Sequence, residues 1–161
     1  MLKHPSNKLL EIGIDEAGRG CLAGPVVAAA VSMPVDLLEN EDYDMSIINL
    51  IKDSKKMTKK NRDLCREYIE CIAIDWAVGL ADNNEIDNVN ILNATHNAMH
   101  RAISNLSILP DFIYVDGNSF KDYYDDYNEL IDYTCVIGGD NEYLNIACAS
   151  IIAKEYHDKI I

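Results

Sequence analysis

Apolar residues in this chain fall into short, nearly continuous runs separated by glycine, proline, asparagine and acidic residues. Such short apolar runs between turn-forming residues are typical of buried β-strands. We expect strands at residues 9–14, 26–33, 73–81, 112–115 and 133–137.

Other segments repeat their apolar residues at the spacing of an amphipathic helix. One helix begins after Thr58, a suitable N-cap, and its apolar side carries Leu64, Cys65, Tyr68, Ile69 and Ile72. A second covers about residues 91–106, and a third runs from residue 143 to the end.

The segments between these elements are polar and predict surface structure. Residues 36–44 are acidic and predict a loop, and residues 119–132 predict irregular structure or a short helix. Asn83 or Asn84 is expected to cap a turn into Glu85.

The predicted order is two strands, a helix, a strand, a helix, two strands and a final helix. This order indicates an α/β protein with one mixed central sheet flanked by helices. At 161 residues, with 48% hydrophobic and 25% charged residues, the chain is expected to form a single domain over residues 1–161.

Neither a membrane segment nor a secretory leader is predicted. No apolar run approaches the roughly 20 residues that span a bilayer, and the N-terminal residues lack an apolar segment of signal-peptide length. The five cysteines form no Cys-x-x-Cys pair, which fits a reducing compartment. We expect a cytoplasmic protein with no membrane partner.

The net charge of −13 weighs against a nucleic-acid partner, since such proteins usually carry a basic face. Seven of the 14 cationic residues nevertheless lie within residues 52–66. This cluster is either a local contact for phosphates or the solvated face of a helix.

Four acidic residues stand at or just after the ends of predicted strands: Asp15, Glu16, Asp116 and Asp140. Ligands of open α/β sheets collect at the carboxyl ends of strands, so these acids can meet. Carboxylates brought together repel one another, and divalent cations relieve that repulsion. Their oxygen ligands suit Mg²⁺ or Mn²⁺, and two such ions about 4 Å apart are a common means of cleaving phosphodiesters.

The segment from Asp15 to Gly20 has the sequence Asp-Glu-Ala-Gly-Arg-Gly, and Leu-Ala-Gly-Pro-Val-Val-Ala-Ala-Ala-Val follows after Cys21. This block resembles the opening signature of the ribonuclease HII family. Further matches follow in the family's order at residues 53–58, 85–87, 90–95, 114–117, 139–140 and 146–154, ending at Asp158.

The resemblance implies a ribonuclease H-like fold and a metal-dependent endoribonuclease. Its substrates would be the RNA strand of RNA–DNA hybrids and single ribonucleotides embedded in duplex DNA. Cleavage on the 5′ side of the ribonucleotide would leave a 3′-hydroxyl and a 5′-phosphate, with Mg²⁺ or Mn²⁺ as a pair of ions.

Position by position, the resemblance implies that Asp15, Glu16, Asp116 and Asp140 are the catalytic, metal-binding acids. It also implies two sets of substrate contacts: a loop that meets the 2′-hydroxyl, formed by Gly18, Arg19 and Gly20, and backbone contacts from Lys55, Lys56 and Asn90. The 2′-hydroxyl distinguishes RNA from DNA, and a loop poor in Cβ atoms lets backbone groups approach it. Lys55 and Lys56 are alternatively solvated surface lysines.

The chain departs from the family pattern at Cys21, Cys148 and His157, where proline, alanine and arginine are usual. It also ends at Ile161, directly after the last motif. We therefore expect a domain without the usual C-terminal helical extension, whose tyrosine packs against the sugar at the RNA–DNA junction. This leaves open a second hypothesis, a nucleic-acid-binding protein that keeps the fold with little or no cleavage.

A dinucleotide-binding loop is disfavoured by the same residues. Gly18, Gly20 and Gly24 miss the required glycine spacing, and the loop leads into a strand instead of a helix. The adjacent carboxylates would also repel a pyrophosphate. A P-loop is excluded because no Gly-Lys-Ser/Thr sequence follows. We expect no organic cofactor and a monomeric protein.

Overall fold

The computed structural model describes residues 10–20, 24–52 and 57–160. Five strands form one mixed sheet in the order β3-β2-β1-β4-β5. The central strand β1 pairs antiparallel with β2 and parallel with β4. The strands are β1 (Glu11–Ala17), β2 (Val26–Ser32), β3 (Asp75–Ala81), β4 (Phe112–Asp116) and β5 (Asp132–Val136).

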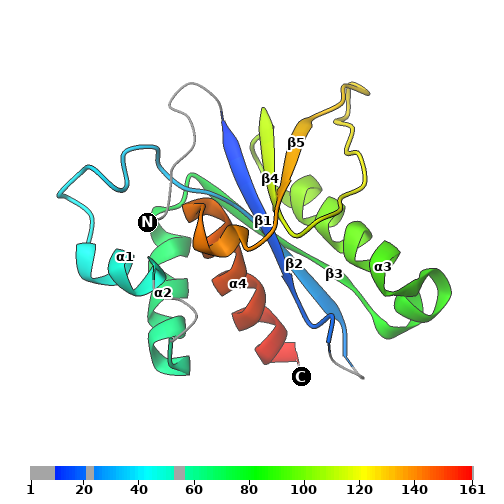
Figure 1. Ribbon diagram of the computed structural model, residues 1–161, viewed down its shortest axis with the longest axis horizontal. Coiled ribbons are helices and arrows are strands. Elements are labelled where there is room, and N and C mark those ends of the chain that lie inside the picture. Colours follow the sequence, from blue (N-terminus) through cyan, green and yellow to red (C-terminus); the bar gives the residue numbers. More distant parts are fainter. Residues whose placement is uncertain (1–9, 21–23, 53–56, 161) are drawn as a thin grey trace.

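Helices cover both faces of this sheet (Figure 1). One face carries α3 (Asn83–Asn105), and the other carries α4 (Leu144–Ile160) with α1 (Met45–Lys52) and α2 (Lys59–Ile72) packed beside it. A short 3₁₀ turn, η2 (Gly139–Asn141), precedes α4. None of the helices in the described residues is both long and apolar enough to cross a membrane. The α/β class with a mixed, helix-flanked sheet is confirmed.

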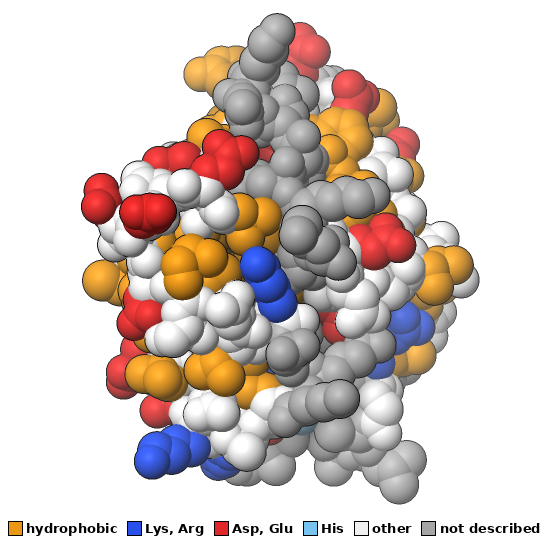
Figure 2. Space-filling view, turned by 60° about the vertical axis from the view of Figure 1, so that its left-hand side comes forward, with side chains coloured by type: hydrophobic (Ala, Val, Ile, Leu, Met, Phe, Trp, Pro, Cys, Tyr) orange, Lys and Arg blue, Asp and Glu red, His pale blue; other side chains and the backbone are white. Residues whose placement is uncertain are grey.

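The surface view in Figure 2 reflects the acidic composition. Acidic side chains gather at the upper left of this face, while the lysines and arginines that the structure describes form separate small patches. This face presents no continuous basic stripe across its described residues.

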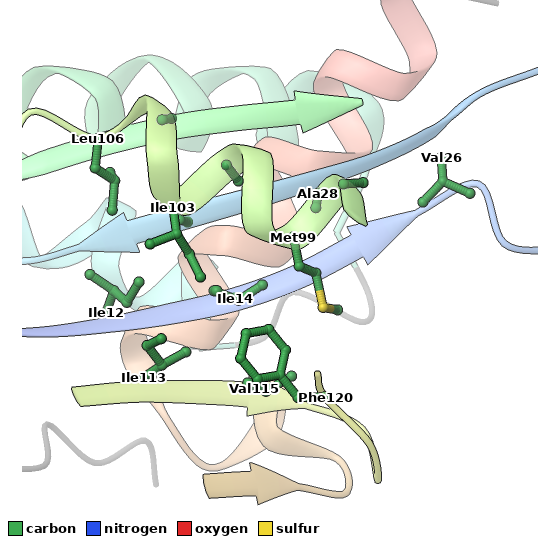
Figure 3. Close-up of a cluster of buried hydrophobic side chains, with 14 of the residues drawn as sticks. Ile12, Ile14, Val26, Ala28, Met99, Ile103, Leu106, Ile113, Val115 and Phe120 are labelled. Carbon is green, nitrogen blue, oxygen red and sulfur yellow. The ribbon is translucent and has the colours of Figure 1, made fainter. Parts of the chain in front are cut away.

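The core has two layers, because alternate strand residues point to opposite sides of the sheet. Ile12 and Ile14 of β1 pack with Ile113 and Val115 of β4 beneath α3 (Figure 3). On the opposite side, α4 contacts the sheet so closely that a Cβ at Gly13 would lie 2.3 Å from the Asn145 backbone carbon. The absence of that Cβ brings α4 directly over β1, the strand that carries the first two acids.

Several predicted boundaries were wrong in an informative way. Strand β1 does not stop at residue 14: Asp15 and Glu16 pair with Ala29 and Ala28 in the ladder with β2, so the acids belong to the strand. Helix α1 was not predicted at all, although Asp44 accepts hydrogen bonds from the backbone N–H and the hydroxyl of Ser46 at its start.

The middle helix also differs from its prediction. It begins at Asn83 with Asp82, not Asn83 or Asn84, as its N-cap. It is interrupted at Asn90, whose φ of 71° lies in the left-handed region. The N-cap at Thr58 is confirmed, since its hydroxyl accepts from the N–H of Asn61 over 3.1 Å.

Candidate active site

Strands β1 and β4 bring Asp15 and Asp116 together. The two strands are parallel, and Ile14 pairs with Val115, so the next residue of each strand is an aspartate. Because side chains alternate along a strand, both aspartates lie on the α4 side of the sheet while their apolar neighbours face α3. Asp15 is 6% exposed and interacts directly with the carboxyl of Asp116.

The charges in this group oppose one another. Burial, followed by repulsion from Glu16 and Asp116, raises the pKa of Asp15 well above its usual value. Burial also raises the pKa of Glu16, although Asp15 and Arg19 lower it in part. The Arg19 guanidinium lies 3.8 Å from Glu16 Oε1 and is itself 45% exposed. One half-exposed arginine therefore offsets only part of the negative charge.

Asp140 does not lie in a strand, unlike the other three acids. It lies in η2, next to Gly139, whose N–H donates to Asp116 Oδ1 over 2.8 Å. Asp15, Glu16 and Asp116 are thus in electrostatic contact at one end of the sheet, and Asp140 follows the glycine that bonds to Asp116. The described residues contain no group of three or more His, Cys, Asp or Glu side chains spaced to hold an ion.

Backbone N–H groups already bond to one oxygen of Asp15 and one oxygen of Asp116, which restricts how closely the carboxylates can gather around one point. Asp15 Oδ1 accepts from the N–H of Glu16 over 2.8 Å, and Asp116 Oδ1 accepts from Gly139. These bonds hold one oxygen of each aspartate on the backbone, while mutual repulsion favours separation of the remaining oxygens.

The donor chemistry of the site, as distinct from the spacing of its acids, suits hard divalent cations. Glu16 Oε2 is buried and has no hydrogen-bond partner among the described residues. A buried oxygen without a partner is costly in a folded protein and indicates a missing ligand or water. Carboxylate oxygens are the donors that Mg²⁺ and Mn²⁺ prefer. Asp15, Glu16, Asp116 and Asp140 are the residues that could hold such ions.

The glycine loop, residues 18–20, follows β1 directly. Gly18 has a φ of +99°, and a Cβ there would lie 2.6 Å from both His157 Nε2 and the Pro25 carbonyl oxygen. A Cβ at Gly20, in contrast, would meet none of the described residues within 4 Å. Gly18 is therefore required by backbone conformation and packing, whereas none of the described residues crowds Gly20.

Three further residues, Lys55, Lys56 and Asn90, were predicted to contact the substrate backbone. Lys55 and Lys56 lie outside the described residues. Asn90 is exposed at the interruption of α3, and its Oδ1 accepts from the N–H of Asn93 over 2.9 Å. Its side chain therefore caps the second half of α3 in this structure.

A cleft of about 80 Å³ lies beside the acids on the α3 side of the sheet. Glu16, Arg19 and Asp116 line this cleft. The lining also includes residues that the sequence analysis did not assign to the site: Thr95, His96, Met99, Asn118 and Ser119. These residues line the cleft because α3 packs against the loop after β4. No local sequence pattern predicts that contact.

The cationic cluster of residues 52–66 divides into two groups. Arg62 contacts Glu155 over 2.8 Å and Asp158 over 2.6 Å, and Arg66 contacts Asp63 over 2.8 Å. Lys59 and Lys60, together with Lys159 of α4, line a hollow of about 570 Å³ between α2 and α4 and form no ion pair among the described residues, although Asp63, Glu155 and Asp158 also line it. Lys59 and Lys60 are exposed and can meet an external anion, whereas the Lys159 ammonium lies 4.9 Å from the centre of the Tyr156 ring.

The fold is similar to solved ribonuclease H structures. Ribonuclease H2 from Pyrococcus horikoshii OT3 matches with a TM-score of 0.71 and 27% identity, over 93% of this chain and 72% of that chain. A Bst-RNase HIII in complex with Mn²⁺ matches with a TM-score of 0.74 and 23% identity, over 94% of this chain and 53% of that one. The architecture is that of the ribonuclease H class.

The family follows from sequence similarity. The family model described as Ribonuclease HII matches residues 12–161. Ribonuclease HII of Phocaeicola vulgatus is 48% identical over 158 residues, which cover 98% of this chain and 72% of the relative. The chain belongs to the ribonuclease HII family and is an endoribonuclease of the ribonuclease H type.

Proposed function

We propose that this protein hydrolyses the RNA strand of RNA–DNA hybrids and incises duplex DNA at single embedded ribonucleotides. Cleavage occurs on the 5′ side of the ribonucleotide and leaves a 3′-hydroxyl and a 5′-phosphate. The proposal goes beyond ribonuclease H activity in naming the substrates and the point of cleavage.

The observation that carries the proposal is the pairing of buried acids with an accessible glycine loop. Asp15 and Asp116 adjoin at the carboxyl ends of β1 and β4, and the loop leaves β1 two residues after Asp15. A ribose bound at the loop would thus have its phosphate next to the acids. Gly20 itself has no side chain, and none of the described residues lies where its Cβ would be, so its backbone groups are suited to contact a 2′-hydroxyl.

We further propose that two divalent cations, Mg²⁺ or Mn²⁺, are held by Asp15, Glu16, Asp116 and Asp140. Such ions supply an activated water and stabilise the leaving oxygen in phosphodiester hydrolysis. The unpartnered Glu16 Oε2 and the repulsion at Asp15 support this assignment, and the Mn²⁺ complex of the related fold is consistent with it.

The chain's own residues orient the substrate. Arg19, half-exposed beside Glu16, is placed to meet the phosphate once cations satisfy the carboxylate. Lys59, Lys60 and Lys159 offer three further cationic groups near the end of α4, and we propose that they contact the duplex backbone.

The test uses three matched duplexes: one all-DNA, one with a single ribonucleotide, and one RNA–DNA hybrid. Incision of the second and third only, dependent on Mg²⁺ or Mn²⁺ and abolished in Asp15→Asn, is the expected result. Equal cleavage of the all-DNA duplex would contradict the substrate assignment. Binding without incision under either metal would favour the alternative of a silent nucleic-acid-binding protein.

A further inference from the structure

His157 lies beneath the glycine loop, although it is 139 positions away from Gly18 in the sequence. It projects from the last turns of α4 and is 6% exposed. The point that a Gly18 Cβ would occupy lies 2.6 Å from His157 Nε2 and 2.7 Å from its Cδ2. The edge of the imidazole ring therefore packs directly against the backbone of Gly18.

The Nε2 atom of this histidine is buried and has no hydrogen-bond partner among the described residues. Leaving a buried polar group unpaired is costly, so most such groups find a partner in a working state of the protein. An apolar side chain would fill the same space without that cost. The unpaired nitrogen thus points to a role that packing alone does not explain.

Pro25 supplies an acceptor close to this nitrogen. Its carbonyl oxygen also lies 2.6 Å from the Gly18 Cβ position, so Nε2 and this oxygen flank the same glycine. Pro25 immediately precedes β2 and lies at the far end of the connection that begins with the glycine loop. Rotation of the ring toward this carbonyl would let Nε2–H donate to it and join α4 to both Gly18 and Pro25.

The far end of the connection is also held from the other side of the sheet. The N–H of Gly24 donates to Asn83 Oδ1 at the start of α3, over 3.1 Å. Helix α3 thus fixes Gly24 by a formed hydrogen bond, while α4 presents His157 to Gly18 without one. The contact with α3 is therefore a completed hydrogen bond, whereas the contact with α4 leaves His157 Nε2 without a partner among the described residues.

We propose that His157 is a positioning residue for ribonucleotide recognition, whose Nε2 engages the backbone at Gly18 and at Pro25 when a ribose occupies the glycine loop. This inference rests on the proposed function, because it assumes that the loop contacts the 2′-hydroxyl. His157 itself touches neither the substrate nor the acids and acts through the backbone of Gly18.

Two substitutions separate the polar role from the space that the ring fills. His157→Leu keeps an apolar volume and removes the nitrogen, whereas His157→Gln retains a polar group near the position of Nε2. Tyr156→Phe is the matched control on the same helix, since its hydroxyl faces Glu70 at 3.5 Å and not the loop.

The measurements are kcat and KM for incision at a single ribonucleotide, and the inhibition constant of the matched all-DNA duplex. We expect His157→Leu to lower kcat/KM about tenfold or more. His157→Gln should restore most of this loss, and Tyr156→Phe should match the wild type. The inhibition constant of the all-DNA duplex should stay unchanged in every variant, because it reports backbone binding alone.

Three outcomes would overturn the inference. Retention of kcat/KM within about twofold in His157→Leu would show that the nitrogen is dispensable. Equal losses in the Leu and Gln variants, with lowered thermal stability, would show that His157 serves only packing. A wild-type protein that incises neither ribonucleotide-containing duplex nor hybrid would remove the proposed function, and the inference with it.

Discussion

The N–H of Gly139 donates to Oδ1 of Asp116 over 2.8 Å, and this bond ties Asp116 to the residue before Asp140, 23 positions along the sequence. It fixes the Asp116 carboxylate against the turn that carries Asp140. Because Gly139 is buried, the turn leaves little room for a larger residue.

Gly139→Ala is expected to disturb this carboxylate. The added Cβ would lie 2.6 Å from Ile146 Cδ1 and 3.3 Å from Asp116 Oδ1, so both side chains must move. We expect a loss of about 1–3 kcal/mol in the free energy of unfolding and roughly a tenfold loss of incision rate. Adding Ile146→Val removes the closer clash and should restore stability in urea denaturation but not activity. Recovery of both would show that the Asp116 contact is unimportant.

Asp15→Asn is expected to abolish incision while stabilising the metal-free protein. Burial and repulsion disfavour the ionised carboxylate, and an amide removes that repulsion. Each kcal/mol gained raises the melting temperature by roughly 3 °C in a chain of this size. Thermal melts with EDTA test the gain, and Mg²⁺ should stabilise only the wild type. Glu11→Gln, the same exchange at a buried acid near the other end of β1, is the control and should retain activity.

The stability of the metal-free protein should also depend on pH, because ionised Asp15 destabilises the folded state. Since the folded-state pKa of Asp15 lies above its ordinary value of 3.8, the folded protein binds the proton more tightly than the unfolded chain. This contribution to stability is present below 3.8 and is lost as pH rises through the folded pKa. The wild type should therefore lose stability relative to Asp15→Asn as pH rises toward neutrality. A constant difference across that range would contradict the assignment.

Gly18→Ala should be much more harmful than Gly20→Ala. Gly18 has a left-handed φ and faces His157 and Pro25, whereas a Cβ at Gly20 would contact no residue that the structure describes. We expect Gly18→Ala to cost more than about 1 kcal/mol of unfolding free energy and most of the activity. Gly20→Ala should change stability by less than about 0.5 kcal/mol, and any loss of its activity would report the substrate contact directly. Similar destabilisation of both would contradict this account of the loop.

Lys59→Gln combined with Lys60→Gln should weaken duplex binding in a salt-dependent way. Both lysines are exposed and border the hollow between α2 and α4. For each phosphate that the variant no longer neutralises, the slope of log affinity against log salt should fall by about one. Fluorescence anisotropy across a salt series measures this slope. Lys121→Gln, also an exposed lysine but outside that hollow, should leave it unchanged.

The sequence allowed the class of fold and most elements to be predicted, because burial imposes clear periods on strands and helices. Helix α1 was missed since its eight residues are too few for a repeat to stand out from the preceding loop. The end of β1 was placed too early because carboxylates normally signal a turn. Here Asp15 is buried within the ladder, which only the pairing with β2 reveals.

The proximity of Asp15 and Asp116 could also be anticipated, since each ends an apolar run. The distances between the acids could not be predicted, because they depend on backbone hydrogen bonds such as the one that Gly139 donates to Asp116. His157 stood out in the sequence only as a departure from the family pattern. Its relation to Gly18 could not be predicted, because it arises from the packing of α4 over the sheet.

The middle position of β1 in the sheet limits how the protein can evolve. An edge strand could shift by one residue and keep half of its partners, but β1 is bonded along both of its sides. A shift of one residue would turn Asp15 toward α3 and bury Ile14 or Glu16 under α4. Insertions and deletions are therefore tolerable in the surface connections but not between residues 11 and 17. A change of length there would displace Asp15 and Glu16 from Asp116 and disrupt the core at the same time.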